Sequence, residues 1–228
     1  YEIRLSLVGS EMCIRDSKDY ETALRGEFKG PLKAYIPFLM LFPGFYSPMS
    51  HASFIDRGDE NPIQQFFVLH EVARQFLGEF AQVGMQGPKP WINEGVAGVM
   101  TFAQPDKDGR WYLPSGRGHE AVRKAADLIV EGGMVPLGVL VHMEEAAFGK
   151  DPGAEQRRTE SSALVRYLLE AKDGIYALDL MELVYDSMKN IKTATFTDYL
   201  GDPTEFEKGF DVMLSGQSGK VILDWKDS

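Results

Sequence analysis

Cysteine is almost absent from this chain of 228 residues, in which Cys13 is the single one. One thiol cannot form a disulfide framework within the chain. Clustered positive charge is also missing, because 24 Lys and Arg are spread among 34 Asp and Glu, for a formal net charge of -10. Nucleic acid is therefore not an expected partner, since phosphate binding requires a basic patch. The longest apolar run, residues 36–42, contains Pro37 and is too short to span a bilayer, so no membrane span is expected.

Residues 1–17 differ in character from the rest of the chain and resemble translated sequencing-adapter read-through at the end of an environmental reading frame. We set them aside as a non-native segment, as one does with a fusion scar; a genuine amphipathic leader is the alternative. Cys13 lies inside this segment, so the rest of the chain has no cysteine, which excludes thiol catalysis. We also expect the native N-terminus to be missing. The localisation is therefore unknown, and a secreted or periplasmic location is compatible with the sequence.

Residues 18–228 are expected to form a single α+β domain. Residues 33–55 are rich in aromatics and interrupted by prolines, which favours short strands and turns, with a candidate strand at 52–55. The sequence thus predicts a small sheet region over 18–62, two helices over 63–104 and a mainly helical body over 105–228. In the last region, periodicity predicts helices at about 119–131, 136–148, 159–172, 176–190 and 203–214.

A long amphipathic helix is predicted from Pro62 to about residue 80, with Asn61 as its N-cap. His70 and Arg74 fall on its inward face, and residues 70–74 read His-Glu-Val-Ala-Arg. A histidine at position 74 would complete the HExxH motif, in which two imidazoles bind zinc and the glutamate activates the bound water. Arg74 cannot take this part, because a guanidinium stays protonated and has no lone pair for a metal.

A second predicted helix carries another carboxylate, Glu94, which is a candidate for a further zinc ligand. Glu94 follows His70 by 24 residues, after Pro90 opens the helix, in the pattern Trp91-x-x-Glu94-Gly-x-Ala. This context resembles the third-ligand helix of gluzincin metallopeptidases. Segments 44–48 and 160–169 extend the likeness to uncharacterised bacterial gluzincin-like families grouped as peptidase MA-like, over about residues 40–215. The resemblance implies a zincin-like fold: a small N-terminal β-sheet, then the active-site helix, then a mainly helical C-terminal body.

The resemblance also assigns roles to individual residues. It implies that His70 is the first zinc ligand, Glu71 the general base and Glu94 the remaining protein ligand. The position of the second histidine holds Arg74, so the ligand set is one short of a catalytic zinc site. We count Arg74 and Trp91 as candidate binding residues. Relatives often carry a tyrosine near Arg158 that would stabilise an oxyanion, and this chain lacks it.

The resemblance further implies that His70, Arg74 and Glu94 converge at one cleft. Small residues give the second helix a smooth side, which we expect to pack against the helix of His70: Gly95, Ala97 and Gly98. An arginine on an inward face needs a carboxylate partner, because a buried unpaired charge is costly. We therefore predict an ion pair of Arg74 with Glu94 or Glu71. The alternative is that the side chain reaches solvent along the cleft.

These observations leave three functional hypotheses. The first is a degenerate gluzincin-like pseudoenzyme that is catalytically impaired, binds zinc weakly or not at all, and retains a cleft for a peptide or protein segment. The second is an active zinc-dependent peptidase with His51 as an unusual third ligand. The third is a purely structural helical domain. A sequencing error at Arg74 is a further alternative, because a single base separates some arginine and histidine codons.

Overall fold

The structure is a computed structural model, and it describes residues 11–14, 17–40, 44–47, 50, 52–56, 63–80, 88–113, 120–130, 133–150, 152–189 and 194–215. The chain divides into two compact units, residues 1–79 and residues 80–228, and each is described by itself. The division falls in the last turn of the helix that carries His70. The single domain predicted for 18–228 stays a prediction.

The first unit contains a sheet of three short strands. β1 (Glu11–Ile14), β2 (Gly44–Ser47) and β3 (Ala52–Asp56) lie in the order β1-β3-β2, with β1 parallel and β2 antiparallel to β3. β3 confirms the strand predicted at 52–55. β1 comes from the segment 1–17 that was set aside on sequence grounds, and the non-native origin of that segment stays a prediction.

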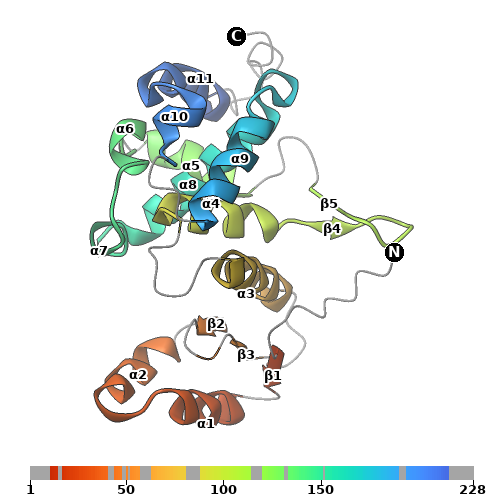
Figure 1. The fold of residues 1–228 in the computed structure, drawn as a ribbon, viewed down its shortest axis with the longest axis vertical. Coiled ribbons are helices and arrows are strands. Elements are labelled where there is room, and N and C mark those ends of the chain that lie inside the picture. The colour runs from red at the N-terminus through yellow and green to blue at the C-terminus, as the bar shows by residue number, and fades with distance from the viewer. Residues whose placement is uncertain are drawn as a thin grey trace. The chain divides into compact units, whose positions relative to one another are not determined.

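Helices cover both faces of this sheet (Figure 1). One face carries α1 (Ser17–Glu27), the 3-10 helix η1 (Gly30–Tyr35) and α2 (Ile36–Leu39), and the other carries α3 (Ile63–Phe80). The region 18–62 is thus more helical than predicted. The signal for α1 was present in the sequence, because Tyr20, Leu24 and Phe28 recur at a spacing of four and are all buried.

Alternation along the strands decides which side chains meet which helices. Ala52 and Phe54 point to the α1 side and pack in a core cluster with Tyr20 and Leu24. Ser53 lies between them in sequence and points to α3, where its hydroxyl donates a hydrogen bond of 2.8 Å to Gln75. The face towards α1 thus contributes Ala52 and Phe54 to the apolar core, and the face towards α3 holds that helix through a buried hydrogen bond.

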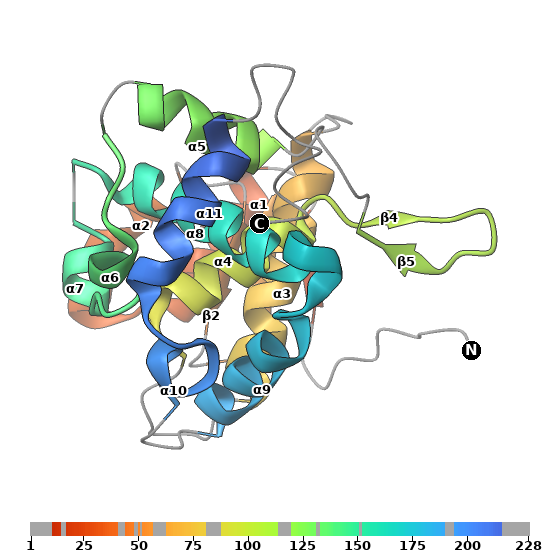
Figure 2. The same cartoon turned by 90° about the horizontal axis from the view of Figure 1, so that it is seen from above.

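The second unit is a helical body with one small hairpin. Its helices α4 and α8 lie side by side at the centre, with α5, α9 and α11 around them, and the β4–β5 hairpin extends from the helices (Figure 2). The elements are α4 (Pro90–Met100), β4 (Gln104–Pro105), β5 (Trp111–Tyr112), α5 (Glu120–Val130), α6 (Leu137–Leu140), α7 (Glu145–Phe148), α8 (Ala154–Glu170), η2 (Ala171–Gly174), α9 (Ala177–Met188), α10 (Phe196–Leu200) and α11 (Pro203–Ser215).

Close packing of α4 on α8 explains the small residues of α4. A Cβ added at Gly98 would lie 1.9 Å from Ser162 Oγ, and one at Gly95 would lie 2.7 Å from the carbonyl oxygen of Ser161. The sequence predicted that this smooth side packs against the helix of His70. Both glycines face α8 instead, and packing of α4 on the helix of His70 stays a prediction, because the two helices belong to different units.

The predicted helices are confirmed in outline. α3, α4, α5, α9 and α11 begin and end close to the predicted residues, whereas α8 begins five residues earlier than expected, after Gly153 with a φ of 108°. The single helix predicted over 136–148 is two short helices, α6 and α7. The described residues form an α+β protein that is mostly helical, as predicted.

Candidate site around Glu71 and Arg74

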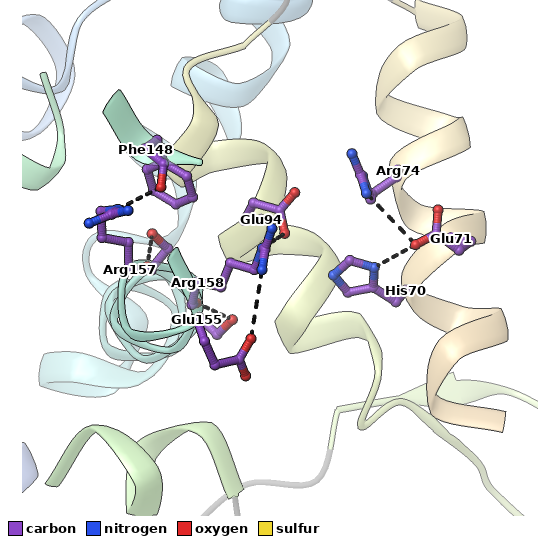
Figure 3. Close-up of polar contacts among 10 residues, drawn as sticks. His70, Glu71, Arg74, Glu94, Phe148, Glu155, Arg157 and Arg158 are labelled. Atoms are coloured by element: carbon purple, nitrogen blue, oxygen red, sulfur yellow. Dashed lines mark hydrogen bonds and ion pairs between the residues drawn. The ribbon is translucent and has the colours of Figure 1, made fainter. Parts of the chain in front are cut away.

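Glu71 is a buried carboxylate whose two oxygens both have partners, and Figure 3 shows those of Oε1. The residue is 4% exposed. Its Oε2 accepts a hydrogen bond of 2.9 Å from the backbone N–H of Tyr46 on β2. Its Oε1 lies 3.1 Å from His70 Nδ1 and 3.8 Å from Arg74 Nη1. The residue that the resemblance assigns as general base is therefore held by three groups of its own unit.

The orientation of Glu71 follows from a row of polar residues on α3. Glu71, Gln75 and Glu79 recur at a spacing of four, which places them on one side of the helix. Each bonds to the sheet, because Gln75 accepts from Ser53 and Glu79 Oε1 accepts from the hydroxyl of Tyr46 at 3.4 Å. The helix thus docks on the sheet through hydrogen bonds, and sequence reasoning missed this although the spacing was visible.

Two glycines permit this close approach. A Cβ at Gly44 on β2 would lie 2.9 Å from Glu71 Cγ, and a Cβ at Gly78 on α3 would lie 2.6 Å from Cε1 of Tyr46. Contacts this short do not occur between real side chains, so a larger residue at either position would shift the helix or the strand. The glycines therefore fix how deeply the carboxylate of Glu71 sits against β2.

The surroundings of Glu71 favour its charged form. Burial raises the pKa of this carboxyl, but the hydrogen bond from His70, the positive charges of Arg74 and His70 and the N–H of Tyr46 outweigh burial and hold the pKa below its ordinary value. A general base works best with a pKa near the operating pH. Lowering the pKa and engaging both oxygens make Glu71 a poor proton acceptor.

Arg74 pairs with Glu71, one of the two partners predicted for it. Its side chain is 39% exposed, and that of His70 is 21% exposed. These two side chains are therefore only partly buried, whereas the sequence predicted an inward position for both. A pair with one exposed member contributes less to stability than a fully buried pair, on the order of 1 kcal/mol.

The donor set of this unit does not fit a catalytic zinc ion. Such a site needs three protein ligands with lone pairs and an open position for water. Here one imidazole, His70, stands beside a carboxylate that is already bonded, and position 74 supplies a cation. Across the described residues, three or more His, Cys, Asp and Glu side chains do not gather anywhere in a way that could hold a metal ion.

In the second unit, Glu94 also lies beside an arginine (Figure 3). Its Oε2 is 3.5 Å from Arg158 Nε on α8, and its side chain is 12% exposed. Arg158 also has its Nη1 3.8 Å from Glu155 Oε2. The resemblance implies a tyrosine near this position, and the structure shows Arg158 there beside two carboxylates, which the sequence analysis did not predict.

The remaining candidates lie as follows. Trp91 is 1% exposed and packs in the core of the second unit, with its ring centroid 5.7 Å from that of Phe196. His51 lies outside the described residues. The convergence of His70 and Arg74 with Glu94 stays a prediction, because they belong to different units. In the part of the chain that is described, no helix is long and apolar enough to cross a membrane.

No family model and no solved structure matches the chain. Some curated proteins match a part of it. The L-threonine 3-dehydrogenase of Deinococcus deserti is 39% identical over 74 residues, which is 30% of this chain and 21% of that protein. Those of Deinococcus radiodurans and Proteus mirabilis are 41% and 42% identical, covering 28% and 23% of this chain and 20% and 17% of the relatives. The chain spans about a fifth of the length of these relatives, and such partial matches assign it to no family.

Proposed function

We propose that this chain is a degenerate gluzincin-like protein with a zincin-like fold, which has lost zinc-dependent hydrolysis and binds a peptide or protein segment. The observation that carries the proposal is the contact of Arg74 with Oε1 of Glu71, the same oxygen that His70 Nδ1 approaches. The guanidinium supplies positive charge to the carboxylate from the position where the motif requires a zinc-binding imidazole.

A second contact supports the same interpretation. Glu94, the remaining carboxylate that the resemblance assigns to zinc, lies 3.5 Å from Arg158. Both carboxylates of the implied site thus have an arginine partner. An isolated buried carboxylate is unfavourable, and an arginine compensates it without any need for a metal. These two arginine–carboxylate contacts favour a stable pseudoenzyme over an enzyme that lacks one ligand.

The proposed binding mode is strand addition. Among the described strands, β2 lies at one edge of the sheet, and an extended peptide adds to such an edge through backbone hydrogen bonds. The Tyr46 N–H of β2 already donates to Glu71, so the incoming segment would use other backbone groups of the strand. This favours binding in a fixed register, with Glu71 holding β2 in place.

Metal content tests the loss of zinc chemistry. We expect the protein to carry far less than one zinc per chain after zinc loading and dialysis, and to cleave no peptide. Arg74→His should raise the zinc content towards one per chain, since it supplies the missing imidazole. His70→Ala in the Arg74→His background is the matched control and should abolish this gain. Stoichiometric zinc in the unmodified protein, lost on His70→Ala, would contradict the proposal and favour the active-peptidase hypothesis.

Peptide binding is tested separately. A tryptic digest of casein added to the isotope-labelled protein should shift the amide resonances of Gly44 and Tyr46 on β2, whose N–H groups point away from β3. Amide resonances of α9 serve as the internal control and should stay unchanged. If the digest shifts no resonance of β2, peptide binding is rejected. If the wild type and both variants also bind no zinc, that result would favour the purely structural hypothesis.

A further inference from the structure

A cavity of about 390 Å³ lies wholly within the second unit, at the corner formed by η2 and α11. Pockets for small molecules generally begin at about 300 Å³. One face of α11 lines it through Glu205, Lys208, Gly209 and Val212, which recur at helical spacings of three and four. This cavity contains none of the residues that the resemblance assigns to zinc chemistry.

The rim of the cavity is a left-handed turn. Lys172 and Asp173 have φ angles of 49° and 58°, and Gly174 continues the turn with 82°. Residues other than glycine rarely adopt this conformation, and two in succession are unfavourable unless their surroundings enforce them. Such backbone strain is concentrated at binding sites and catalytic sites. Lys172 of this turn is one of the residues that line the cavity.

Aromatic residues form a rigid wall. Tyr176 and Phe206 meet edge to face with ring centroids 4.9 Å apart. A Cβ at Gly209 would lie 2.2 Å from the hydroxyl oxygen of Tyr167, so the glycine leaves room for that hydroxyl. Burial, with a smaller effect of Tyr176, raises the pKa of Tyr167, and its hydroxyl therefore stays protonated near neutral pH.

The charges at the mouth favour an anion. Lys172 and Lys208 are exposed on the wall, and within the described parts of the chain neither ammonium group forms an ion pair. Glu205 is the single carboxylate among the lining residues, so the cavity carries a net positive charge in a protein of formal net charge -10. The side chains of Phe206, Leu200 and Val212 offer an apolar surface beside these charges.

We propose that this cavity binds a small organic monocarboxylate with an apolar, ring-sized body. Lys172 and Lys208 bind the carboxylate, while the aromatic wall and Val212 contact the body. The left-handed turn of Lys172 and Asp173 is retained because it aims the Lys172 ammonium group at the ligand. A neutral molecule of the same shape lacks the charge-assisted contacts and binds more weakly.

Calorimetric titration of the full chain tests this, with indole-3-propionate as the probe and its primary amide as the uncharged control. We expect saturable binding of the acid and at least about tenfold weaker binding of the amide, because hydrogen bonds to charged groups contribute roughly that factor. Saturable binding of the acid and the amide with equal affinity would overturn the proposal, as would the absence of saturable binding. Complete displacement by inorganic phosphate would indicate a general anion site and would also overturn it.

Variants separate binding from stability. Lys172→Gly removes the charge and the strained side chain, so it should weaken binding about tenfold while raising Tm by about 2–4 °C. Asp173→Gly relieves the neighbouring strain and is the matched control, expected to leave affinity within about twofold. Lys208→Met, at an exposed position of α11, should weaken binding without lowering Tm. Unchanged affinity in both lysine variants would overturn the proposal.

Discussion

Two buried glutamates of this chain have opposite electrostatic surroundings. Glu71 receives bonds from His70 and the Tyr46 N–H and faces Arg74, which together lower its pKa. Glu160 on α8 is fully buried, and its Oε1 accepts from the Val135 N–H at 3.1 Å and from Gln156 Nε2 at 2.9 Å. Its Oε2 has no hydrogen-bond partner among the described residues. Burial outweighs the two bonds and the charge of Arg157, and raises the pKa of Glu160 to about 7.

This raised pKa predicts how stability depends on pH. The unfolded chain releases the Glu160 proton near its ordinary pKa of 4.5, whereas the folded chain keeps it until about 7. The folded state therefore binds more protons between these values, and stability falls as pH rises through this window, by on the order of 3 kcal/mol. Glu160→Gln removes this titration. Urea unfolding at pH 5 and pH 7.5 should show a smaller loss of stability in the variant than in the wild type.

Glu155→Gln is the matched control for this measurement, because Glu155 lies on the same helix with its side chain 80% exposed. Its pH dependence should follow that of the wild type. If Glu160→Gln also keeps the wild-type slope, then Glu160 does not carry a proton in the folded state near neutral pH.

At the scale of elements, α3 and β2 approach each other at glycines. Alanine is normally the better helix former by about 1 kcal/mol. At Gly78, however, the added Cβ would lie 2.6 Å from the ring of Tyr46, which is 7% exposed and has little room to move. Overpacking of this kind costs about 1–3 kcal/mol, so the steric cost exceeds the gain in helix propensity.

We therefore predict that Gly78→Ala lowers the free energy of unfolding by up to about 2 kcal/mol, measured by urea denaturation of the full chain. Gly26 on α1 is the control, since it is exposed and a Cβ there would meet no atom within 4 Å. Gly26→Ala should raise the free energy of unfolding by about 0.5–1 kcal/mol. Equal stabilisation by both substitutions would show that α3 does not pack against Tyr46 as described.

At the scale of the whole molecule, each compact unit has a hydrophobic core of its own. The core of the first unit is centred on Tyr20, Leu24 and Phe54, and that of the second on residues such as Leu164 and Phe210. Every residue of the larger cluster belongs to the second unit. A unit of this size buries enough apolar surface to be stable by itself.

Residues 80–228 expressed alone are therefore expected to fold. Their far-ultraviolet circular dichroism should be helical, and their thermal unfolding should be a single cooperative transition. A variant of this fragment with Leu164→Asp, which introduces a charge at a fully buried position, is the control and should not unfold cooperatively. A fragment of wild-type sequence without a cooperative transition would mean that the second unit depends on the first.

The sequence by itself determined those features that depend on neighbouring residues. The pair Asn61-Pro62 and the apolar period that follows predicted α3, which begins at Ile63 and ends at Phe80. Pro90 predicted the start of α4 in the same way. The chemistry of one side chain was equally accessible, because the guanidinium of Arg74 cannot bind a metal whatever its surroundings. These conclusions needed no knowledge of how the elements pack.

The tertiary structure decided the partners. Glu71 takes its hydrogen bond from Tyr46, 25 residues away in sequence, and Glu94 pairs with Arg158 from a different helix. Gly95 and Gly98 face α8, whereas the sequence analysis expected them to pack against the helix of His70. The spacing of residues along one helix shows which side chains share a face, but not which element covers that face. The covering element depends on how the whole unit buries its apolar surface and pairs its polar groups. The same packing decides which carboxylates form hydrogen bonds or ion pairs within the unit.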